Sequence, residues 1–281
     1  MYDVIIIGSG PAGISAGIYL KRAKKNVLII SKENSALEKA EKIENYYGVE
    51  SISGKKLYEI GIKQAKALEI QIETDEVTNI SFENNFVVTT VNSEYEAKNV
   101  IIATGTNRKT PNIKGIKEFE GKGVSYCAIC DAFFYRNKDV VVIGNGNYAI
   151  HEANNLKPVA KTVTILTNGK DMIENRNASD FEIDETPIRE FRGTNVIEEV
   201  EFNNNNIKKI NGVFVAIGTA SSTDLAKKIG AAVKNNNIVV DENMETTVKG
   251  LYACGDCTGG LLQVNKAVYE GAKAAINIIK N

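Results

Sequence analysis

Two segments of the chain repeat one pattern of apolar and polar positions. Each has a short apolar run, a glycine turn, a helix-forming stretch and a second apolar run. Continuously apolar strands are typical of parallel sheets buried on both faces, so each segment predicts a βαβ unit. The first unit has its strands at residues 4–7 and 27–30, and the second has them at residues 140–143 and 163–166. Two such units predict an α/β fold with two nucleotide-binding-type domains.

Further apolar runs mark the remaining buried strands and one long helix. Residues 100–105, 212–218 and 250–256 each read as a strand that leads into a glycine turn. The last is followed by residues 264–279, whose apolar positions fall on one helical face. The polar stretch that follows residues 100–105 contains Pro111 and Gly115. Proline and glycine interrupt helices and strands, so this stretch indicates a crossing between domains.

Composition and charge exclude several classes of protein. The 281 residues include 34 Lys+Arg and 35 Asp+Glu, so the net charge of −1 argues against nucleic-acid binding by bulk charge. Hydrophobic residues make up 43% of the chain, which is a globular value, yet no apolar run reaches the ~18 residues of a membrane span. The opening MYDVIIIGSG lacks the basic start and cleavage site of a signal peptide. We therefore expect a soluble, cytoplasmic protein.

The first glycine turn has the spacing of a dinucleotide-binding loop. Gly8 permits the tight turn, Gly10 lets a pyrophosphate approach the backbone, and Gly13 lets helix and strand pack closely. The helix that follows supplies N–H donors and a positive dipole end to the phosphates. Because the motif follows a strand and precedes a helix, it predicts a bound dinucleotide.

Four cysteines form two Cys-x-x-Cys pairs, Cys127/Cys130 and Cys254/Cys257. Without an export signal, this spacing favours redox or metal chemistry over structural disulfides. The first pair can cycle between dithiol and disulfide, and the adjacent Asp131 offers an acid for the leaving thiolate. Zinc bound by all four cysteines and chemically inert cysteines remain as alternatives, although we expect no metal. The only histidine is His151, so catalysis by a Ser-His-Asp triad is not expected.

From end to end the chain resembles the low-molecular-weight thioredoxin reductases. The resemblance is carried by GSGPAG at residues 8–13, KIENYYG at 42–48, IIATGT at 101–106, GKGVSYCAICDAFFYRNKDVVVIG at 121–144, GVFVAIG at 212–218 and GLYACGDCTGG at 250–260. It implies two Rossmann-like domains of the FAD/NAD(P) type, the second inserted in the first. Residues 1–111 and 244–281 would bind FAD, and residues 112–243 would form a pyridine-nucleotide-type domain that carries the redox cysteines. It also implies thioredoxin as the protein substrate and a homodimer.

The resemblance assigns roles to individual residues. Cys130 matches the cysteine that faces the flavin, Cys127 matches the interchange thiol that attacks thioredoxin, and Asp131 matches the acid/base. Just before the last helix, Leu262 replaces the arginine of the family's Arg-Gln-Ala segment. The positions expected to contact FAD are Gly8, Gly10, Pro11, Ala12, Gly13, Asn45, Ala103, Thr104, Gly105, Gly255, Asp256, Gln263 and Val264.

The second glycine turn departs from the family pattern of NADPH-dependent reductases. Asn145 replaces a glycine, and Tyr148 stands where a small hydroxyl residue normally leaves room for the pyrophosphate. The arginines that would pair with a 2′-phosphate after residues 163–166 are replaced by Thr167-Asn168-Gly169. The inserted domain is also short. These losses narrow the resemblance to ferredoxin-dependent flavin thioredoxin reductases with a degenerate nucleotide site.

The sequence leaves the electron donor open. Reduced ferredoxin is the favoured donor, and an NADPH- or NADH-dependent thioredoxin reductase with a divergent site is the first alternative. A flavin dithiol oxidase of a small molecule and a non-catalytic flavin-binding protein are the others. Because acidic ferredoxins favour basic patches, candidate docking residues are Lys21, Arg22, Lys24, Lys25, Arg108 and Lys109.

Overall fold

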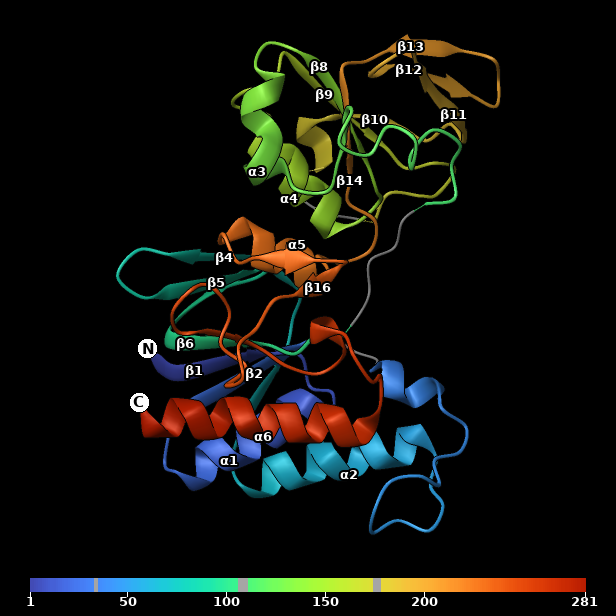
Figure 1. The fold of residues 1–281 in the computed structure, drawn as a ribbon. Coiled ribbons are helices and arrows are strands. Elements are labelled where there is room, and N and C mark those ends of the chain that lie inside the picture. The colour runs from blue at the N-terminus through green and yellow to red at the C-terminus, as the bar shows by residue number, and fades with distance from the viewer. Residues whose placement is uncertain (33–34, 106–110, 174–177) are drawn as a thin grey trace. The chain divides into compact units, whose positions relative to one another are not determined.

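A computed structural model of the chain describes residues 1–32, 35–105, 111–173 and 178–281. Within these ranges, the side chains of Ala36, Lys39, Ile129, Cys130 and Ala178 are not described. The chain divides into two compact units (Figure 1). Unit 1 comprises Met1–Asn107 and Ser221–Asn281, and unit 2 comprises Arg108–Ala220.

Unit 1 is built on a seven-stranded mixed sheet. Its strands are β3 (Gln71–Thr74), β2 (Val27–Ser31), β1 (Tyr2–Ile7), β6 (Glu94–Ile102), β5 (Phe86–Thr90) and β4 (Val77–Phe82) in spatial order, with β17 (Leu251–Ala253) also paired to β6. The pairs β3–β2, β2–β1, β1–β6 and β6–β17 are parallel. Strands β4 and β5 form an antiparallel extension beside β6.

Three helices cover one face of this sheet: α1 (Pro11–Arg22), α2 (Gly54–Ala67) and α6 (Val264–Lys280), as Figure 1 shows. Helices α1 and α6 approach closely, since a Cβ at Gly271 would collide with the carbonyl of Ala12. The hydroxyl of Ser15 also donates to the carbonyl of Val268 across the same contact, at 2.8 Å. The unit's shorter elements are η1 (Ala36–Lys39), α5 (Ser222–Lys228), β15 (Val233–Lys234), β16 (Asn237–Ile238) and η4 (Asp256–Thr258).

Unit 2 has a five-stranded parallel sheet and a separate antiparallel sheet. The first sheet is ordered β10 (Glu182–Asp184), β9 (Thr162–Leu166), β8 (Asp139–Ile143), β14 (Gly212–Val215) and β7 (Val124–Ser125). The second is ordered β11 (Ile188–Gly193), β12 (Ile197–Phe202) and β13 (Ile207–Lys209). The helical elements are α3 (Ala128–Asp131), η2 (Ala132–Tyr135), α4 (Asn147–Leu156) and η3 (Ala178–Asp180).

The structure confirms both predicted βαβ units and the α/β fold class. Strand β1 pairs in parallel with β2 across α1, and β8 pairs in parallel with β9 across α4. The buried positions of these strands account for much of the core of each unit. The long helix expected near the carboxyl terminus is α6.

The compact units differ from the expected domain bounds at the return to the first unit. Residues 221–243 had been expected in the inserted domain, but they group with unit 1. Helix α5 packs against β4, and Lys228 Nζ donates to the carbonyl of Thr78 at 2.9 Å. The chain thus rejoins the first unit soon after β14 and before Met244.

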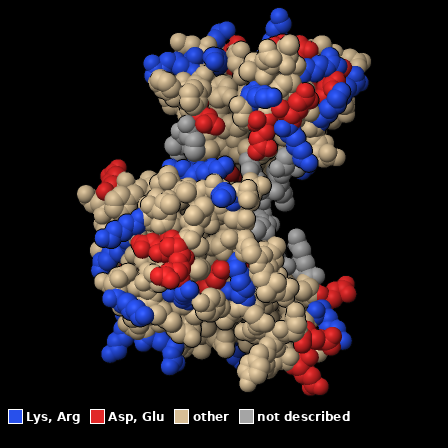
Figure 2. All heavy atoms as spheres, viewed as in Figure 1, with Lys and Arg blue, Asp and Glu red and all other residues tan. Residues whose placement is uncertain are grey.

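Charged side chains of both signs are mixed over the face drawn in Figure 2, in keeping with the near-zero net charge. Basic side chains gather on the part of unit 1 where both chain termini lie. Among the described residues, no helix has the length and hydropathy needed to cross a bilayer.

Candidate active site

The carboxyl ends of four parallel strands meet at one edge of the unit 1 sheet. Ile7 of β1 pairs with Ile30 of β2 and with Ile102 of β6, and Ala253 of β17 also pairs with Ile102. The segments that follow β1, β6 and β17 therefore lie close together, although they come from distant parts of the sequence. In open α/β sheets this edge is where ligands bind.

The first glycine turn has the geometry that its spacing predicts. Gly8 has φ +110°, and a Cβ there would collide with the carbonyl of Ala103, so only glycine fits. A Cβ at Gly13 would collide with the carbonyl of Gly8. Gly10 precedes α1 with no side-chain cap. Among the described residues beyond its neighbours, a Cβ at Gly10 would meet only Ser35 Oγ, 3.8 Å away. The amino end of α1 is thus open to an anion.

The turn after β6 offers an unpaired polar group to the same edge. The Thr104 hydroxyl oxygen is buried and has no hydrogen-bond partner within the described part of the chain. Buried hydroxyls are normally hydrogen-bonded, so an unpaired one at this edge fits a ligand. The next residue, Gly105, has φ +71°, and its carbonyl accepts a hydrogen bond from Ser222 Oγ at 3.0 Å.

Two predicted contacts from distant segments are brought together at the start of α6. Asn45 Nδ2 donates to Gln263 Oε1 at 3.0 Å, and Asn265 Nδ2 donates to the carbonyl of Asn45 at 3.2 Å. Gln263 is the N-cap of α6 and Val264 is its first residue. The two expected positions therefore form one surface.

A largely buried ion pair is hydrogen-bonded to the turn after β17, and it was not predicted from the sequence. Glu270 Oε2 accepts from Gly255 N at 2.9 Å, while Lys266 Nζ donates to the carbonyl of Gly255 at 2.7 Å. Lys266 and Glu270 are themselves 3.0 Å apart, and both contact Thr258. Burial raises the pKa of Asp256 in this turn, and the Lys266 ammonium partly offsets the shift. The i,i+4 spacing of the lysine and glutamate was the available signal.

A second feature missed by the sequence analysis is a chain of hydroxyls at the end of β2. Ser9 Oγ donates to Ser31 Oγ at 2.7 Å and lies 2.8 Å from the Tyr58 hydroxyl. Dinucleotide folds often carry an acidic residue at this strand end for the ribose. Here Ser31 occupies that position.

The redox segment lies in unit 2 between β7 and η2. Cys127 is buried and disulfide-bonded. The side chain of Cys130 lies outside the description, so its pairing with Cys127 stays a prediction. Ser125, which the sequence analysis did not identify, links the cysteine to the predicted acid. Its hydroxyl donates to Asp131 Oδ2 at 2.6 Å and accepts from Cys127 N at 3.1 Å. Burial raises the pKa of Tyr135, and the charge of Asp131 adds to the shift.

The other cysteine pair, Cys254 and Cys257, is buried and is expected to be unreactive. Cys254 and Cys257 are free thiols with no exposed surface. Burial raises the pKa of Cys257 to about 12 and also raises the pKa of Cys254 well above its ordinary value. Cys257 Sγ donates weakly to the carbonyl of Ile102 at 3.4 Å. Both therefore stay protonated at neutral pH and act as small buried residues.

The second glycine turn is covered by the chain itself. Asn145 Nδ2 donates to the carbonyl of Asp171 at 3.0 Å, and Ile173 N donates to the carbonyl of Asn145 at 2.9 Å. The Cδ1 atom of Ile173 would lie 3.4 Å from a Cβ at Gly146. The segment 171–173 thus occupies the approach to the turn that precedes α4.

The side chain of Tyr148 does not lie where the sequence predicts. We had expected its ring to crowd the phosphate turn. Instead the side chain is buried, and its hydroxyl donates to the carbonyl of Tyr126 at 3.4 Å. The ring faces the redox segment because α4 packs against α3.

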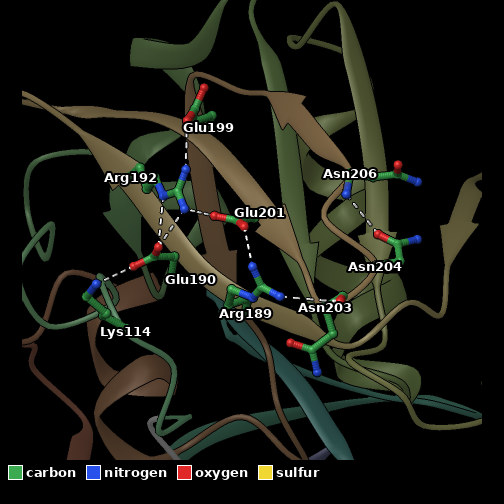
Figure 3. Close-up of polar contacts among 9 residues, drawn as sticks. All are labelled: Lys114, Arg189, Glu190, Arg192, Glu199, Glu201, Asn203, Asn204 and Asn206. Carbon is green, nitrogen blue, oxygen red and sulfur yellow. Dashed lines mark hydrogen bonds and ion pairs between the residues drawn. The ribbon is translucent and has the colours of Figure 1, made fainter.

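The two arginines of β11 are paired with carboxylates (Figure 3). Arg189 Nη1 lies 2.6 Å from Glu201 Oε1, and Arg192 Nη2 lies 2.8 Å from Glu190 Oε1 and also contacts Glu201. Glu190 is further paired with Lys114. These guanidiniums are therefore already neutralised within unit 2.

Four of the six basic residues considered for ferredoxin docking lie away from the ligand edge. Lys21 and Arg22 end α1, and Lys24 and Lys25 follow it. The helix has 12 residues, so its two ends are roughly 18 Å apart. Lys21 Nζ is also bonded to the carbonyl of Glu69 at 3.0 Å. Arg108 and Lys109 lie outside the described residues.

Comparisons with known proteins agree with this architecture. The family model described as pyridine nucleotide-disulphide oxidoreductase matches residues 2–271. The chain is 33% identical over 294 residues to a thioredoxin reductase of Ureaplasma parvum, covering 98% of this chain and 95% of that protein.

Two solved structures are similar over almost the whole chain. One is the atypical thioredoxin reductase TRi from Desulfovibrio vulgaris Hildenborough, with a TM-score of 0.93, 35% identity and coverage of 100% of this chain and 98% of the other. The second is a ferredoxin-flavin thioredoxin reductase from Clostridium acetobutylicum, with a TM-score of 0.72, 36% identity and coverage of 99% and 97%.

Proposed function

The chain belongs to the pyridine nucleotide-disulphide oxidoreductases and, within them, to the thioredoxin reductases, and on that premise we propose that its electron donor is reduced ferredoxin. Electrons would enter through FAD, pass to a Cys127–Cys130 disulfide and leave to thioredoxin. The flavin and the oxidoreductase class follow from the family. The residue roles are those that the resemblance implies, and the donor is inferred from the second glycine turn of this chain.

The residues at the strand edge of unit 1 fit FAD. We assign the pyrophosphate to the turn at Gly10 and the amino end of α1, because a ligand there meets backbone N–H groups, and among the described side chains beyond the neighbours of Gly10 only Ser35 comes within 4 Å of a Cβ built there. The Thr104 hydroxyl, which has no hydrogen-bond partner among the described residues, and the turn at Asp256 lie at the same edge. Asn45 and Gln263 would contact the ring system.

The redox segment would transfer the electrons to the protein substrate. FAD, when bound, supplies two electrons to a disulfide. Asp131, which accepts a hydrogen bond from Ser125 Oγ, would give a proton to the thiolate released when that disulfide opens. Cys127 would attack thioredoxin, and Cys130 would face the flavin. Beside this segment Phe133 and Phe134 are 72% and 67% exposed, which suits an apolar protein partner.

The observation that carries the choice of donor is the covered second glycine turn. A pyridine nucleotide needs its pyrophosphate at that turn, where Asn145 and Ile173 are bonded to each other. The paired Arg189 and Arg192 leave no free guanidinium on β11 for a 2′-phosphate. The similar Clostridium acetobutylicum protein is a ferredoxin-flavin enzyme.

The energetics permit this route. A plant-type ferredoxin has a potential of about −400 mV and thioredoxin about −270 mV. The difference of ~130 mV is worth roughly 6 kcal/mol for two electrons.

A turnover assay tests the proposal. The holoenzyme and thioredoxin would be incubated without oxygen, with either chemically reduced ferredoxin or NADPH as donor, and new thioredoxin thiols counted. Thiols should form only with ferredoxin. Turnover with NADPH would point to the ordinary nucleotide-dependent reductase. The feature that supports that alternative is the second glycine turn, which keeps Gly144 and Gly146 before α4. Oxygen consumption without thioredoxin would point to a dithiol oxidase.

We also infer a homodimer. Helix α6 exposes Tyr269 and Ile276, at 59% and 39%, which a second copy of the chain could cover. Sedimentation of the holoenzyme at micromolar concentration should give twice the chain mass, and a monomer would remove this inference.

A further inference from the structure

Two buried side chains of helix α4 contact the redox segment. The function proposed above assigns a role to neither of them. Tyr148 and Glu152 lie one turn apart on the helix, and each is 1% exposed. The hydroxyl of Tyr148 donates to the carbonyl of Tyr126, and Glu152 Oε2 accepts from Ala128 N at 2.6 Å. These two contacts fall on the residues immediately before and after Cys127. The helix that would follow a nucleotide phosphate turn therefore holds the cysteine segment.

The Glu152 contact places a carboxylate at the start of the redox helix. Ala128 is the first residue of α3, and its N–H is one of the donors that give a helix its positive end. That positive end normally favours a cysteine thiolate in a Cys-x-x-Cys segment. A carboxylate bonded to it has the opposite influence. Asp131, at the end of the same helix, is a second carboxylate, and α3 carries no basic residue in its last turn.

The charge of Glu152 is not needed for the hydrogen bond alone. A glutamine of the same shape would accept from Ala128 N as well, without the cost of removing a charge from water. The deeply buried Glu152 side chain therefore brings a carboxylate, and not only a hydrogen-bond acceptor, to the start of the redox helix.

We propose that Glu152 is a positioning residue that sets the reducing strength of the redox-active disulfide. It fixes the start of α3 through Ala128 N, and its charge disfavours the thiolate form of the reduced pair. The disulfide gains two electrons and two protons to become two thiols. Since stabilising the reduced form makes a disulfide more oxidising, a carboxylate beside it makes the dithiol a better reductant. This inference rests on the proposed function of Cys127 and Cys130 as the redox pair.

Glu152→Gln tests the charge while keeping the shape and the acceptor. The holoenzyme and the variant would be equilibrated at pH 8.5 in buffers of reduced and oxidised dithiothreitol. The redox peptide would then be alkylated and its thiols quantified by mass spectrometry. We expect the dithiol–disulfide equilibrium of the variant to shift about tenfold toward dithiol, equivalent to ~30 mV for a two-electron couple. Glu198→Gln, an exposed glutamate on β12 of the same unit, is the matched control and should not shift it.

The outcomes separate this inference from the proposed function. If the wild-type redox peptide never gains thiols in any buffer, the redox role of the cysteines is wrong. If the wild type titrates and Glu152→Gln follows it within twofold, the role of Glu152 is wrong.

If the Glu152→Gln variant does not fold, a measurement on the wild-type protein still tests the inference. The rate of Cys127 alkylation in the reduced protein, followed against pH, should have its midpoint at or above 8.5, the ordinary pKa of a cysteine thiol. A midpoint below 7.5, typical of an unopposed helix amino end, would overturn the inference.

Discussion

The two glycine turns of this chain have the same sequence pattern and different surroundings. Both follow a buried parallel strand and begin a helix, at Gly10 for α1 and at Gly146 for α4. The turn in unit 1 is open as far as the described residues show, with Ser35 Oγ 3.8 Å from a Cβ built at Gly10. The turn in unit 2 is covered by residues 171–173, which are bonded to Asn145. The glycine spacing thus reports the βαβ fold, whereas ligand binding depends on what lies over the turn.

On the proposed function, unit 2 acts through the redox segment and not through the second glycine turn. Cys127→Ser should abolish thioredoxin reduction, because the attacking thiol is missing, while FAD in unit 1 stays bound and reducible. Cys130→Ser should also stop turnover yet let Cys127 trap thioredoxin as a mixed disulfide. Mass spectrometry of the trapped complex identifies the cross-linked cysteine. If only the Cys127→Ser variant traps thioredoxin, through Cys130, the two roles are reversed.

Asp131→Asn should slow turnover by a factor on the order of 10²–10⁴, the usual range for acid–base help. The amide keeps the shape and can still bond to Ser125 Oγ, but it cannot supply a proton. Stopped-flow measurement of disulfide opening gives the rate. A rate equal to that of the wild type would remove Asp131 from the mechanism.

The matched substitutions Gly10→Ala and Gly146→Ala test the comparison of the turns directly. Both glycines have negative φ, and no described atom beyond their chain neighbours lies closer than 3.4 Å to a methyl group at either position, so both variants should fold. At Gly10 the methyl group would enter the space of the pyrophosphate. We expect FAD affinity to fall roughly 10–100-fold, equivalent to about 1.4–2.8 kcal/mol.

At Gly146 the same change should leave FAD affinity and turnover with ferredoxin unaltered, since no ligand is expected there. Flavin fluorescence titration of the apoproteins measures both affinities. Equal losses in the two variants would contradict the comparison.

The smallest expected effect concerns the stability of the folded protein and the buried cysteines that follow β17 in unit 1. Burial raises the pKa of Cys257 in the folded protein to about 12, above that of an unfolded thiol near 8.5. The folded state thus favours the protonated thiol, and its contribution to stability is complete below pH 8.5. It is lost as pH rises from 8.5 toward 12, because the unfolded chain ionises first.

Denaturant unfolding of wild type and Cys257→Ala across pH 7–11 should show a smaller alkaline loss in the variant. Parallel losses would mean that other groups account for the pH dependence.

The sequence predicted the parts of the molecule that depend on local pattern. The strands and helices of both βαβ units follow from apolar runs and glycine spacing. Asn45 and Gln263, each expected to contact FAD, are hydrogen-bonded to each other, and their contact with FAD stays a prediction. What it did not predict depends on side chains that meet through the tertiary fold. The inward path of Tyr148 and the bond between Glu152 and Ala128 arise because α4 packs on α3, and no local pattern encodes that contact.

The return of the chain to unit 1 at Ser221 was missed for a similar reason. Helix α5 is short, and its place is fixed by the contact of Lys228 with β4 and not by a composition change. The cover over the second turn likewise requires Ile173 to reach Asn145, which lies 28 positions earlier in the chain, by the difference between the two residue numbers.

The most direct test of the account offers each donor to the oxidised holoenzyme in an anaerobic stopped-flow instrument and follows the flavin absorbance. Because the second turn is covered, NADPH and NADH at millimolar concentration should not bleach the flavin on the timescale of turnover. Reduced ferredoxin should bleach it, and added thioredoxin should restore the colour. Rapid bleaching by micromolar NADPH would contradict the account, because it would show that the second glycine turn is open to a nucleotide after all.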